Sequence, residues 1–280
     1  MNEAGAGPIF LVGAGRMGSA LLKGWLAQGI APDRIFVQEP SLGGDVAALI
    51  RDAGIGTGTP PALPTAPAVV VIAVKPQAMD DVLPSLAALT GRDTLVISIA
   101  AGTTIANIAR HFAPDAAIVR AMPNTPAAVG RGITALYANA FVQPGQRDAC
   151  AALLGAVGET VWLADEAQMD AVTALSGSGP AYVFLLAECM AKAGEAAGLA
   201  PELAAKLARA TVSGAGELLR LSDLDPAELR RNVTSPGGTT AAALRVLMGE
   251  ADCGDAGPLE AIFREAVEAA ALRSRELAGS

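Results

Sequence analysis

The sequence predicts a two-part protein, with an α/β doubly wound parallel sheet in residues 1–165 and an all-helical part in residues 166–280. Three observations predict this fold class. Short apolar runs alternate with stretches of helical periodicity in the first half, as in parallel sheets covered on both faces. A glycine-rich turn joins the first apolar run to the first helix, and no strand-like run follows Glu166.

In the first part, the apolar runs predict buried strands and the periodic segments predict the helices between them. The expected strands are residues 9–12, 34–37, 69–74, 95–99, 117–120 and 133–137, and the last strand-like run is 160–163. The expected helices are residues 19–26, 46–50 and 79–89. Where the two parts meet, Asp165, Glu166 and Asp170 are expected to be solvated acids.

In the second part, helices are expected at residues 169–175, 181–197, 202–221, 239–248 and 259–277. Pro180 and Pro201 suit the first turns of helices, and Gly198 suits a helix end. The run from Tyr182 to Ala187 is apolar on nearly all sides, so its helix needs cover on several faces. A lone helical domain of this size offers too little cover, and we therefore expect a homodimer with intertwined helices.

The composition argues against several classes of partner and location. The net charge is −8 and no stripe of Lys and Arg is present, which argues against nucleic-acid binding. The longest apolar runs are too short to span a bilayer, and the N-terminus lacks the basic segment of a signal peptide. Cys150, Cys189 and Cys253 show no metal-ligand spacing, so we expect reduced thiols, no metal site and a cytoplasmic protein without membrane contact.

The glycine-rich turn has the spacing of a dinucleotide-binding fingerprint, because Gly13-Ala14-Gly15-Arg16-Met17-Gly18 follows a strand and opens a helix. Gly13 would permit the tight turn, Gly15 the approach of a pyrophosphate, and Gly18 the packing of helix on strand. A plain strand-to-helix turn is the alternative. Glu39, at the end of the second strand, could accept a hydrogen bond from a ribose 2′-hydroxyl and would repel a 2′-phosphate, which favours NADH over NADPH.

Further loops fall at the carboxyl ends of predicted strands, where open α/β sheets bind ligands. Lys75 precedes a proline and could lie along the cofactor, or it could be a surface lysine. Asn124, between two prolines, could bind the nicotinamide carboxamide or cap its own turn. The loops are Ala73-Val74-Lys75-Pro76, Ser98-Ile99-Ala100-Ala101-Gly102 and the run from Arg120 to Pro126.

The run Thr234-Ser235-Pro236-Gly237-Gly238-Thr239-Thr240 lies just before a helix and predicts a binding site for a small anion. Its glycines let the backbone turn sharply, and the first N–H groups of the helix then point at the anion. Thr240 would stand beside the anion with a hydroxyl that can donate or accept a proton. A helix-capping hydroxyl is the alternative role. Together with the dinucleotide fingerprint, this run predicts a substrate-carboxylate pocket facing a cofactor.

Taken in order along the chain, these motifs resemble those of the Δ1-pyrroline-5-carboxylate reductase family over essentially the whole length. The resemblance rests on Gly13–Gly18, Ala73–Pro76, Met122–Pro126, Leu175–Tyr182 and Val233–Thr240, of which the last two are the most specific. It implies an N-terminal Rossmann domain and a C-terminal helical dimerisation domain. It also implies reduction of the cyclic imine to L-proline by NADPH or NADH, the last step of proline biosynthesis. A homodimer is the implied minimal unit, with a ring of dimers as a larger form.

The resemblance further implies roles for individual residues. Thr240 would be the catalytic proton donor to the ring nitrogen and would serve a cofactor bound by the partner subunit. Backbone amides of Gly237, Gly238 and Thr239 would hold the substrate carboxylate, while Ser98–Gly102 and Met122–Thr125 would lie along the nicotinamide. The full expected set is Ser235, Gly237, Gly238, Thr239, Met122 and Ser178 for the substrate, and Gly13, Ala14, Gly15, Arg16, Met17, Gly18, Glu39, Ala73, Val74, Lys75, Pro76, Ala100 and Asn124 for the cofactor.

Several alternatives stay open. Relatives that prefer NADPH often carry a small polar residue in place of Glu39 and an Asn in the loop filled here by Thr59-Pro60-Pro61, so neither of these partners for a 2′-phosphate is present. Ser41, Arg34 and Arg51 are the alternative counterweights to Glu39. Another two-domain reductase, such as a β-hydroxyacid dehydrogenase or an imine reductase, would need a lysine or acid where this chain has Ser176–Pro180. The third alternative is a nucleotide sensor without catalysis. Such a protein would not need a second anion site, which argues against this alternative because the run Thr234–Thr240, here called the diglycine loop, is intact.

Overall fold

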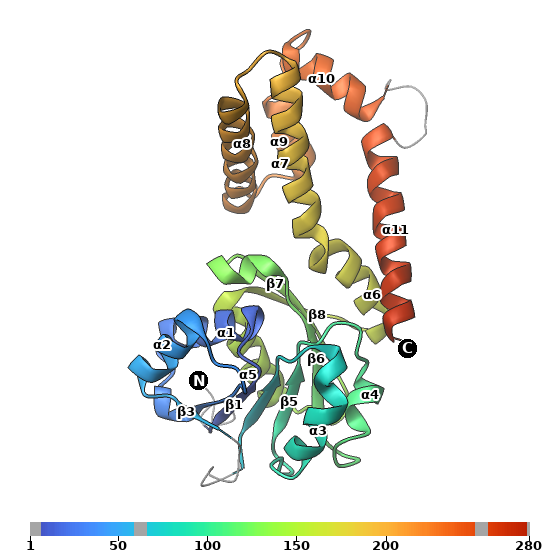
Figure 1. Cartoon of the computed structure of the whole chain (residues 1–280). Coiled ribbons are helices and arrows are strands. Elements are labelled where there is room, and N and C mark those ends of the chain that lie inside the picture. Colours follow the sequence, from blue (N-terminus) through green and yellow to red (C-terminus); the bar gives the residue numbers. More distant parts are fainter. Residues whose placement is uncertain (1–6, 59–65, 250–256, 279–280) are drawn as a thin grey trace. The chain divides into compact units, whose positions relative to one another are not determined.

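The computed structural model describes residues 7–58, 66–249 and 257–278 of the chain (Figure 1). These residues form two compact units. The first contains the described residues up to Gly177 together with those from Ala271 onward, and the second is Ser178–Ala270. The domain boundary expected at Asp165 stays a prediction. Cys253 and the loop Thr59-Pro60-Pro61 lie outside the described residues.

The first unit is built on a sheet whose described strands have the order β3-β2-β1-β4-β5-β6-β7-β8. Strands β1, β4 and β5 are buried along their whole length, as parallel strands covered on both faces should be. Val12 is in register with Gln38 and with Ile72, so the carboxyl ends of β2, β1 and β4 lie level at one edge. The strands are β1 (Ile9–Val12), β2 (Ile35–Gln38), β3 (Gly56–Thr57), β4 (Val69–Ile72), β5 (Leu95–Ser98), β6 (Ala117–Met122), β7 (Gly132–Ala138) and β8 (Gly158–Trp162).

The sheet is mostly parallel rather than wholly parallel, because β7 pairs antiparallel with β6 and parallel with β8. The reason is the short connection between β6 and β7, since a parallel crossover needs about a dozen residues or more. This connection contains a 3-10 turn, Thr125–Val129, and reverses the chain. The expected strand positions are otherwise confirmed to within two residues, apart from β3, a two-residue exposed strand that no hydrophobic pattern marks.

Helices cover both faces of the sheet and divide the core into two clusters. Helices α1 (Arg16–Ala27), α2 (Gly44–Ala53) and α5 (Pro144–Leu154) bury apolar side chains on one face. Helices α3 (Met79–Ala87) and α4 (Ile105–Ala109) do so on the other (Figure 1). The α5 helix was not expected from periodicity, although Pro144 at its first turn and a capping box between Gln143 and Gln146 mark its start.

The second unit is helical, as expected, and its helices are α7 (Gly179–Ala196), α8 (Pro201–Leu221), α9 (Pro226–Asn232) and α10 (Thr239–Met248). Helices α7 and α8 approach closely at Gly194, where a Cβ atom would lie 3.2 Å from the Cβ atom of Ala204. Helix α11 (Pro258–Ala278) begins in this unit and ends in the first one. The expected helix 169–175 is α6 (Met169–Val172) followed by one π-helical turn, Thr173–Gly177.

The helices of the second unit leave large apolar side chains uncovered. No residue of α7 is buried, and Phe184 in its middle is 67% exposed. The neighbouring side chains of Val183, Leu185 and Leu186 are also about half exposed. None of the helices in the described ranges combines the length and the hydropathy that a membrane span requires. The apolar face of α7 therefore lacks cover within its own unit.

Candidate functional site

The glycine turn between β1 and α1 has the geometry that a bound pyrophosphate requires. Gly13 has φ +94°, and a Cβ atom there would lie 2.7 Å from the carbonyl oxygen of Ala73. A Cβ atom on Gly18 would collide with the carbonyl oxygen of Gly13. At Gly15, the N-cap of α1, a Cβ atom would meet no described atom within 4 Å. The turn is thus tightly packed on the protein side and open above the first amides of α1, where an anion binds best.

Glu39 follows β2 and holds the glycine turn at the same edge of the sheet. Its carboxylate accepts a hydrogen bond from the backbone N–H of Ala14 at 2.9 Å and another from the N–H of Ser41 at 3.1 Å. The side chain is half-buried rather than free in solvent. A negative charge is therefore fixed beside the turn, at the place where a Rossmann fold holds the adenosine ribose.

The loop after β4 lies against this turn. The backbone N–H of Ala73 donates to the carbonyl oxygen of Val12 at 2.7 Å, which ties the end of β4 to the end of β1. Lys75 has extended φ and ψ angles of −67° and 148°, as expected for a residue before a proline, and its side chain is exposed. The structure thus brings Ala73–Pro76 to the glycine turn. A role for these residues in cofactor binding stays a prediction.

The loops after β5 and β6 lie at the same edge, beyond β4. Ser98 is fully buried, and its hydroxyl accepts a hydrogen bond from the N–H of Ala100 at 3.3 Å. The side chain of Met122 packs on Gly177, where a Cβ atom would lie 2.5 Å from its Cε atom. The structure therefore brings both predicted nicotinamide-side loops to the edge that carries the glycine turn.

The side chain of Asn124 is engaged by the protein itself. Its carbonyl oxygen accepts from the N–H of Ile133 at 3.0 Å, and its Nδ2 donates to the carbonyl oxygen of Ser176 at 3.2 Å. It makes no capping hydrogen bond to the turn that follows, so the turn-capping alternative is wrong. A hydrogen bond to a nicotinamide carboxamide would require one of these two partners to be exchanged.

A buried ion pair that sequence reasoning missed lies beneath these loops. The guanidinium of Arg120, in β6, lies 2.9 Å from Oε1 of Glu166, and the Arg120 side chain is only 5% exposed. The same oxygen accepts a hydrogen bond from the N–H of Ile105 at 2.8 Å. The expectation of a solvated acidic cluster is wrong for Glu166, and also for Asp170, which accepts a hydrogen bond from the Ser274 hydroxyl at 2.7 Å. Such pairs join residues far apart in sequence, and no local pattern signals them.

The diglycine loop lies in the second unit and ends at helix α10, as expected. Gly237 has φ +68°, and Gly238 is the N-cap of α10. One expectation needs correction: the N–H of Gly238 donates to the carbonyl oxygen of Ser235 at 3.0 Å and is used by the turn itself. No described residue accepts a hydrogen bond from the amides of Thr239 or Thr240. These two amides and the half-buried hydroxyl side chain of Thr240 lie together at the start of the helix, where an anion would be favoured, and anion binding there stays a prediction.

Ser178, the remaining expected substrate residue, is the N-cap of α7 and the first residue of the second unit. Its side chain makes no capping hydrogen bond. It follows the π-helical turn that carries the Ser176 carbonyl bonded to Asn124. The structure thus places Ser178 at the start of the helical unit, and a contact with substrate stays a prediction.

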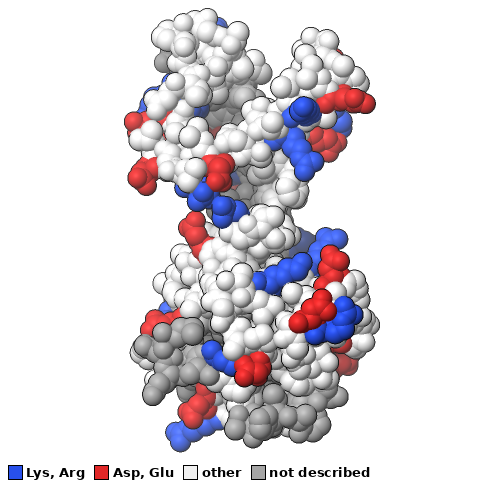
Figure 2. Space-filling view, turned by 90° about the vertical axis from the view of Figure 1, so that its left-hand side faces the viewer, with Lys and Arg blue, Asp and Glu red and all other residues white. Residues whose placement is uncertain are grey.

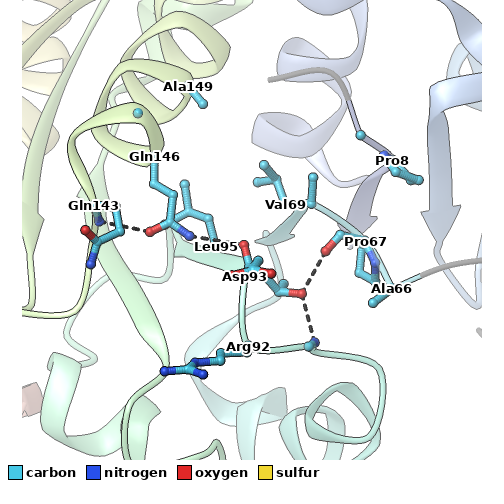
Figure 3. A pocket seen from close by; sticks show the side chains of 15 residues that line it. Pro8, Ala66, Pro67, Val69, Arg92, Asp93, Leu95, Gln143, Gln146 and Ala149 are labelled. Atoms are coloured by element: carbon cyan, nitrogen blue, oxygen red, sulfur yellow. Dashed lines mark hydrogen bonds between the residues drawn. The ribbon is translucent and has the colours of Figure 1, made fainter. Parts of the chain in front are cut away.

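A hollow of about 610 Å³ lies at the opposite, amino-terminal edge of the sheet (Figure 3). Some of its polar groups bond to each other: the Thr94 hydroxyl donates to the Pro67 carbonyl at 2.7 Å, and Gln146 Nε2 donates to the Asp93 carbonyl at 3.1 Å. In open α/β sheets, ligands bind at the carboxyl ends of the strands instead. We therefore place the candidate site at the glycine-turn edge and assign no ligand to this hollow.

Charged side chains are spread thinly over the face that Figure 2 shows. On the face shown in Figure 2, Lys and Arg side chains are interspersed with acidic ones and with uncharged surface. Among the described residues, some charges pair locally, such as Lys192 with Glu188 on α7 at 2.6 Å. The described residues on this face form no continuous basic stripe of the kind that binds a nucleic-acid backbone.

Comparison with known proteins gives a consistent result for both parts of the chain. Residues 166–277 match a family model described as pyrroline-5-carboxylate reductase dimerisation. Residues 8–102 match a model described as NADP oxidoreductase coenzyme F420-dependent. The helical part is therefore of a type that self-associates, and the sheet part is of a nucleotide-binding oxidoreductase type.

Relatives and solved structures agree over nearly the whole length. The pyrroline-5-carboxylate reductase of Pseudomonas aeruginosa is 44% identical over 272 residues, with 96% of each chain covered. That of Synechocystis is 44% identical over 271 residues, covering 95% of this chain and 97% of the relative. The Coxiella burnetii structure of such a reductase superimposes with a TM-score of 0.87 at 37% identity, covering 97% of this chain and 98% of the other. The Plasmodium falciparum structure, with NADP bound, gives 0.76 at 29% identity with the same coverage.

Proposed function

Because this chain belongs to the pyrroline-5-carboxylate reductase family, we propose that it reduces Δ1-pyrroline-5-carboxylate to L-proline with a reduced nicotinamide nucleotide. The observation that carries this proposal is the start of α10. Two unbonded amides and the hydroxyl of Thr240 are presented together there, after a backbone turn that Gly237 permits with φ +68°. A small carboxylate and an adjacent ring nitrogen are the groups that such an arrangement fits.

The cofactor fits the residues at the edge of the sheet. The pyrophosphate would lie over Gly15 and the first amides of α1, where a ligand meets no obstructing Cβ atom. Ala73–Pro76 would line the cofactor beyond this turn. The nicotinamide would lie toward Ala100, Met122 and Asn124, on the loops that follow β5 and β6. The bound nucleotide supplies the hydride that reduces the C=N bond.

Either NADPH or NADH would satisfy these contacts, and we propose that Glu39 makes NADH the better partner. Its carboxylate is held beside the glycine turn by the amides of Ala14 and Ser41. A ribose 2′-hydroxyl can donate to such an oxygen, whereas a 2′-phosphate brings a second negative charge next to it. The Plasmodium falciparum relative was solved with NADP bound, so this preference would distinguish the two chains.

The protein's part in the chemistry is orientation and proton supply. The amides of Thr239 and Thr240 would fix the carboxylate, which in turn fixes the ring carbon that receives the hydride. Orientation of this kind can supply about 7–11 kcal/mol in favourable cases. The Thr240 hydroxyl would donate a hydrogen bond to the ring nitrogen and relay a proton to it, giving the amine of proline. A threonine hydroxyl is too weak an acid to protonate an imine fully by itself, so water would complete the relay.

A second copy of the chain would complete the assembly. The uncovered apolar side chains of α7 and the match to a dimerisation model both support a homodimer held by the helical part. In that dimer, Thr240 of one copy would serve the cofactor bound by its partner. A ring of dimers would be a larger form of the same assembly. The free thiols of Cys150 and Cys189 are compatible with the reducing cytoplasm that we propose as its location.

The test is the loss of absorbance of the reduced nucleotide when pyrroline-5-carboxylate is added, with NADH and NADPH in separate reactions. Proline formation at the same rate supports the proposal. Thr240→Ala should lower turnover by about 10²–10⁴-fold, the usual contribution of a positioned proton donor, while Thr240→Ser should retain most of it. Absence of nucleotide oxidation would leave a non-catalytic nucleotide-binding protein. Normal turnover in Thr240→Ala would remove this residue from the mechanism.

A further inference from the structure

The segment from Glu166 to Gly177, here called the brace, contacts one of the loops that we expect beside the nicotinamide, Met122–Thr125, and the helix start that follows the other, Ser98–Gly102. At its start, Oε1 of Glu166 accepts from the N–H of Ile105 and pairs with the guanidinium of Arg120. At its end, the carbonyl of Ser176 accepts from Asn124, and Gly177 lies against the side chain of Met122. All these residues belong to one compact unit.

One carboxylate oxygen therefore joins the start of α4, which follows the first of these loops, to strand β6, which leads into the second. Ile105 begins α4 and ends the loop that follows β5, and its amide at the first position of the helix has no partner within α4. Arg120 lies two residues before Met122, at the carboxyl end of β6, and is paired in register with Ser98 of β5. Since Glu166 bonds to both at 2.8 and 2.9 Å, a shift of the start of α4 relative to β6 must stretch one of these contacts, and the loops joined to these two elements are restrained with them.

Burial makes these contacts rigid. The Arg120 side chain is 5% exposed and that of Glu166 is 25% exposed, so neither charge can exchange its partner for bulk water without cost. The brace is itself held at Asp170, whose carboxylate accepts from Ser274 near the end of α11. Residues that support the residues of a site from behind, as the brace does here, keep a reacting group within a fraction of an ångström of its productive position.

We infer that Glu166 is a positioning residue for hydride transfer, which acts through the brace on the two loops beside the nicotinamide and leaves the adenosine half of the cofactor site unaffected. This inference rests on the proposed function, because it assumes that a nicotinamide lies against those loops. The adenosine half depends on different contacts, those of the glycine turn and Glu39, and none of these involves the brace. Binding of the adenosine half of the nucleotide and placement of its nicotinamide half can therefore be measured separately.

Glu166→Gln tests the inference, because it keeps the shape and an acceptor oxygen but removes the charge that holds Arg120. Asp165→Asn is the matched control: it makes the same charge change one residue away, at an exposed side chain that caps its own turn through the N–H of Ala167. Each variant is measured for affinity to ADP-ribose, which lacks the nicotinamide, for affinity to the reduced nucleotide, and for turnover. Hydrogen exchange of the peptide that contains Ile105 reports on the loop directly.

We expect Glu166→Gln to lower turnover by about 10- to 100-fold, as misplacement of a reacting group by an ångström does, with faster exchange at Ile105 and unchanged affinity for ADP-ribose. A deuterium isotope effect from labelled nucleotide should rise, because hydride transfer becomes slower. Asp165→Asn should behave as the wild type. Equal losses for ADP-ribose and the reduced nucleotide would show a general structural role and overturn the inference, as would wild-type behaviour.

If Glu166→Gln does not fold, Arg120→Lys tests the pair from its other side, because it keeps the positive charge and replaces the planar guanidinium, whose Nη1 meets Glu166, by a flexible ammonium. Failure of this inference can also be told apart from failure of the proposed function. Failure of the wild type to turn over pyrroline-5-carboxylate would end that function, while the two affinities and the exchange rate would still show whether Glu166 holds the nicotinamide-side loops.

Discussion

Gly15→Ala and Gly18→Ala each add one methyl group to the same turn. From the structure we expect the first to lower cofactor affinity and the second to lower the stability of the fold. At Gly15, φ −64° and ψ −162° are open to alanine, and the new Cβ atom would meet no described atom within 4 Å. The fold should therefore lose no more than about 1 kcal/mol, the cost of a poorer helix N-cap. At Gly18, the Cβ atom would collide with the backbone carbonyl of Gly13, which no side-chain rotation can relieve.

For cofactor affinity the order of the two variants should be reversed: Gly15→Ala, which barely affects stability, should weaken binding directly. In Gly15→Ala the methyl group would occupy the space through which a pyrophosphate approaches the amides of α1. Forcing a methyl group into an occupied space costs about 1–3 kcal/mol, which corresponds to a cofactor affinity about 5- to 150-fold lower. Gly18→Ala should first lower the thermal unfolding midpoint, and any loss of affinity would accompany that loss of stability.

Isothermal titration of each variant with NADH and with ADP-ribose, together with thermal unfolding of the unliganded protein, separates the two effects. ADP-ribose carries the pyrophosphate and should lose affinity in Gly15→Ala as NADH does. Unchanged affinity for both ligands in a normally folded Gly15→Ala protein would refute the placement of the pyrophosphate over this turn. A marked loss of stability in Gly15→Ala would refute the view that the turn is open there.

Three further predictions concern other parts of the first unit. Glu39→Ser should raise the ratio of NADPH to NADH efficiency about tenfold, by removing roughly 1.4 kcal/mol of repulsion toward a 2′-phosphate, and steady-state kinetics with each nucleotide measures it. Trp25→Phe removes the indole N–H that donates to the Leu153 carbonyl at 2.8 Å, and it should lower the free energy of unfolding, measured in urea, by about 1–3 kcal/mol. Trp162→Phe is the control: the indole ring of Trp162 stacks under Arg147, and its loss should lower the free energy of unfolding by about 1 kcal/mol or less. Burial raises the pKa of the Cys150 thiol, so the reactive thiolate should not form at neutral or mildly alkaline pH, and mass spectrometry should find this cysteine alkylated in urea but not in the native protein.

Part of the site could be predicted from the sequence because its signals are local. The three glycines between β1 and α1 carry their spacing in six consecutive residues, and the structure gives each the packing that the spacing implies. The same holds for Gly237 and the start of α10. Where a local signal was weak, prediction failed: α5 has only its capping box and a first-turn proline to mark it, and β3 is too short for any periodicity.

The sequence by itself therefore determined most of the strands and helices, the glycine turns that open α1 and α10, and the family. Only the tertiary structure decided which polar groups are already engaged. The N–H of Gly238 donates to the carbonyl of Ser235. The side chain of Asn124 donates to the carbonyl of Ser176 and accepts from the N–H of Ile133, and Glu166 lies against Arg120 rather than in water. The physical reason is that a hydrogen bond or ion pair depends on distance in space. Most of these partners lie too far apart in the chain for any periodic pattern to encode, and they meet only when the strands of the sheet are in register.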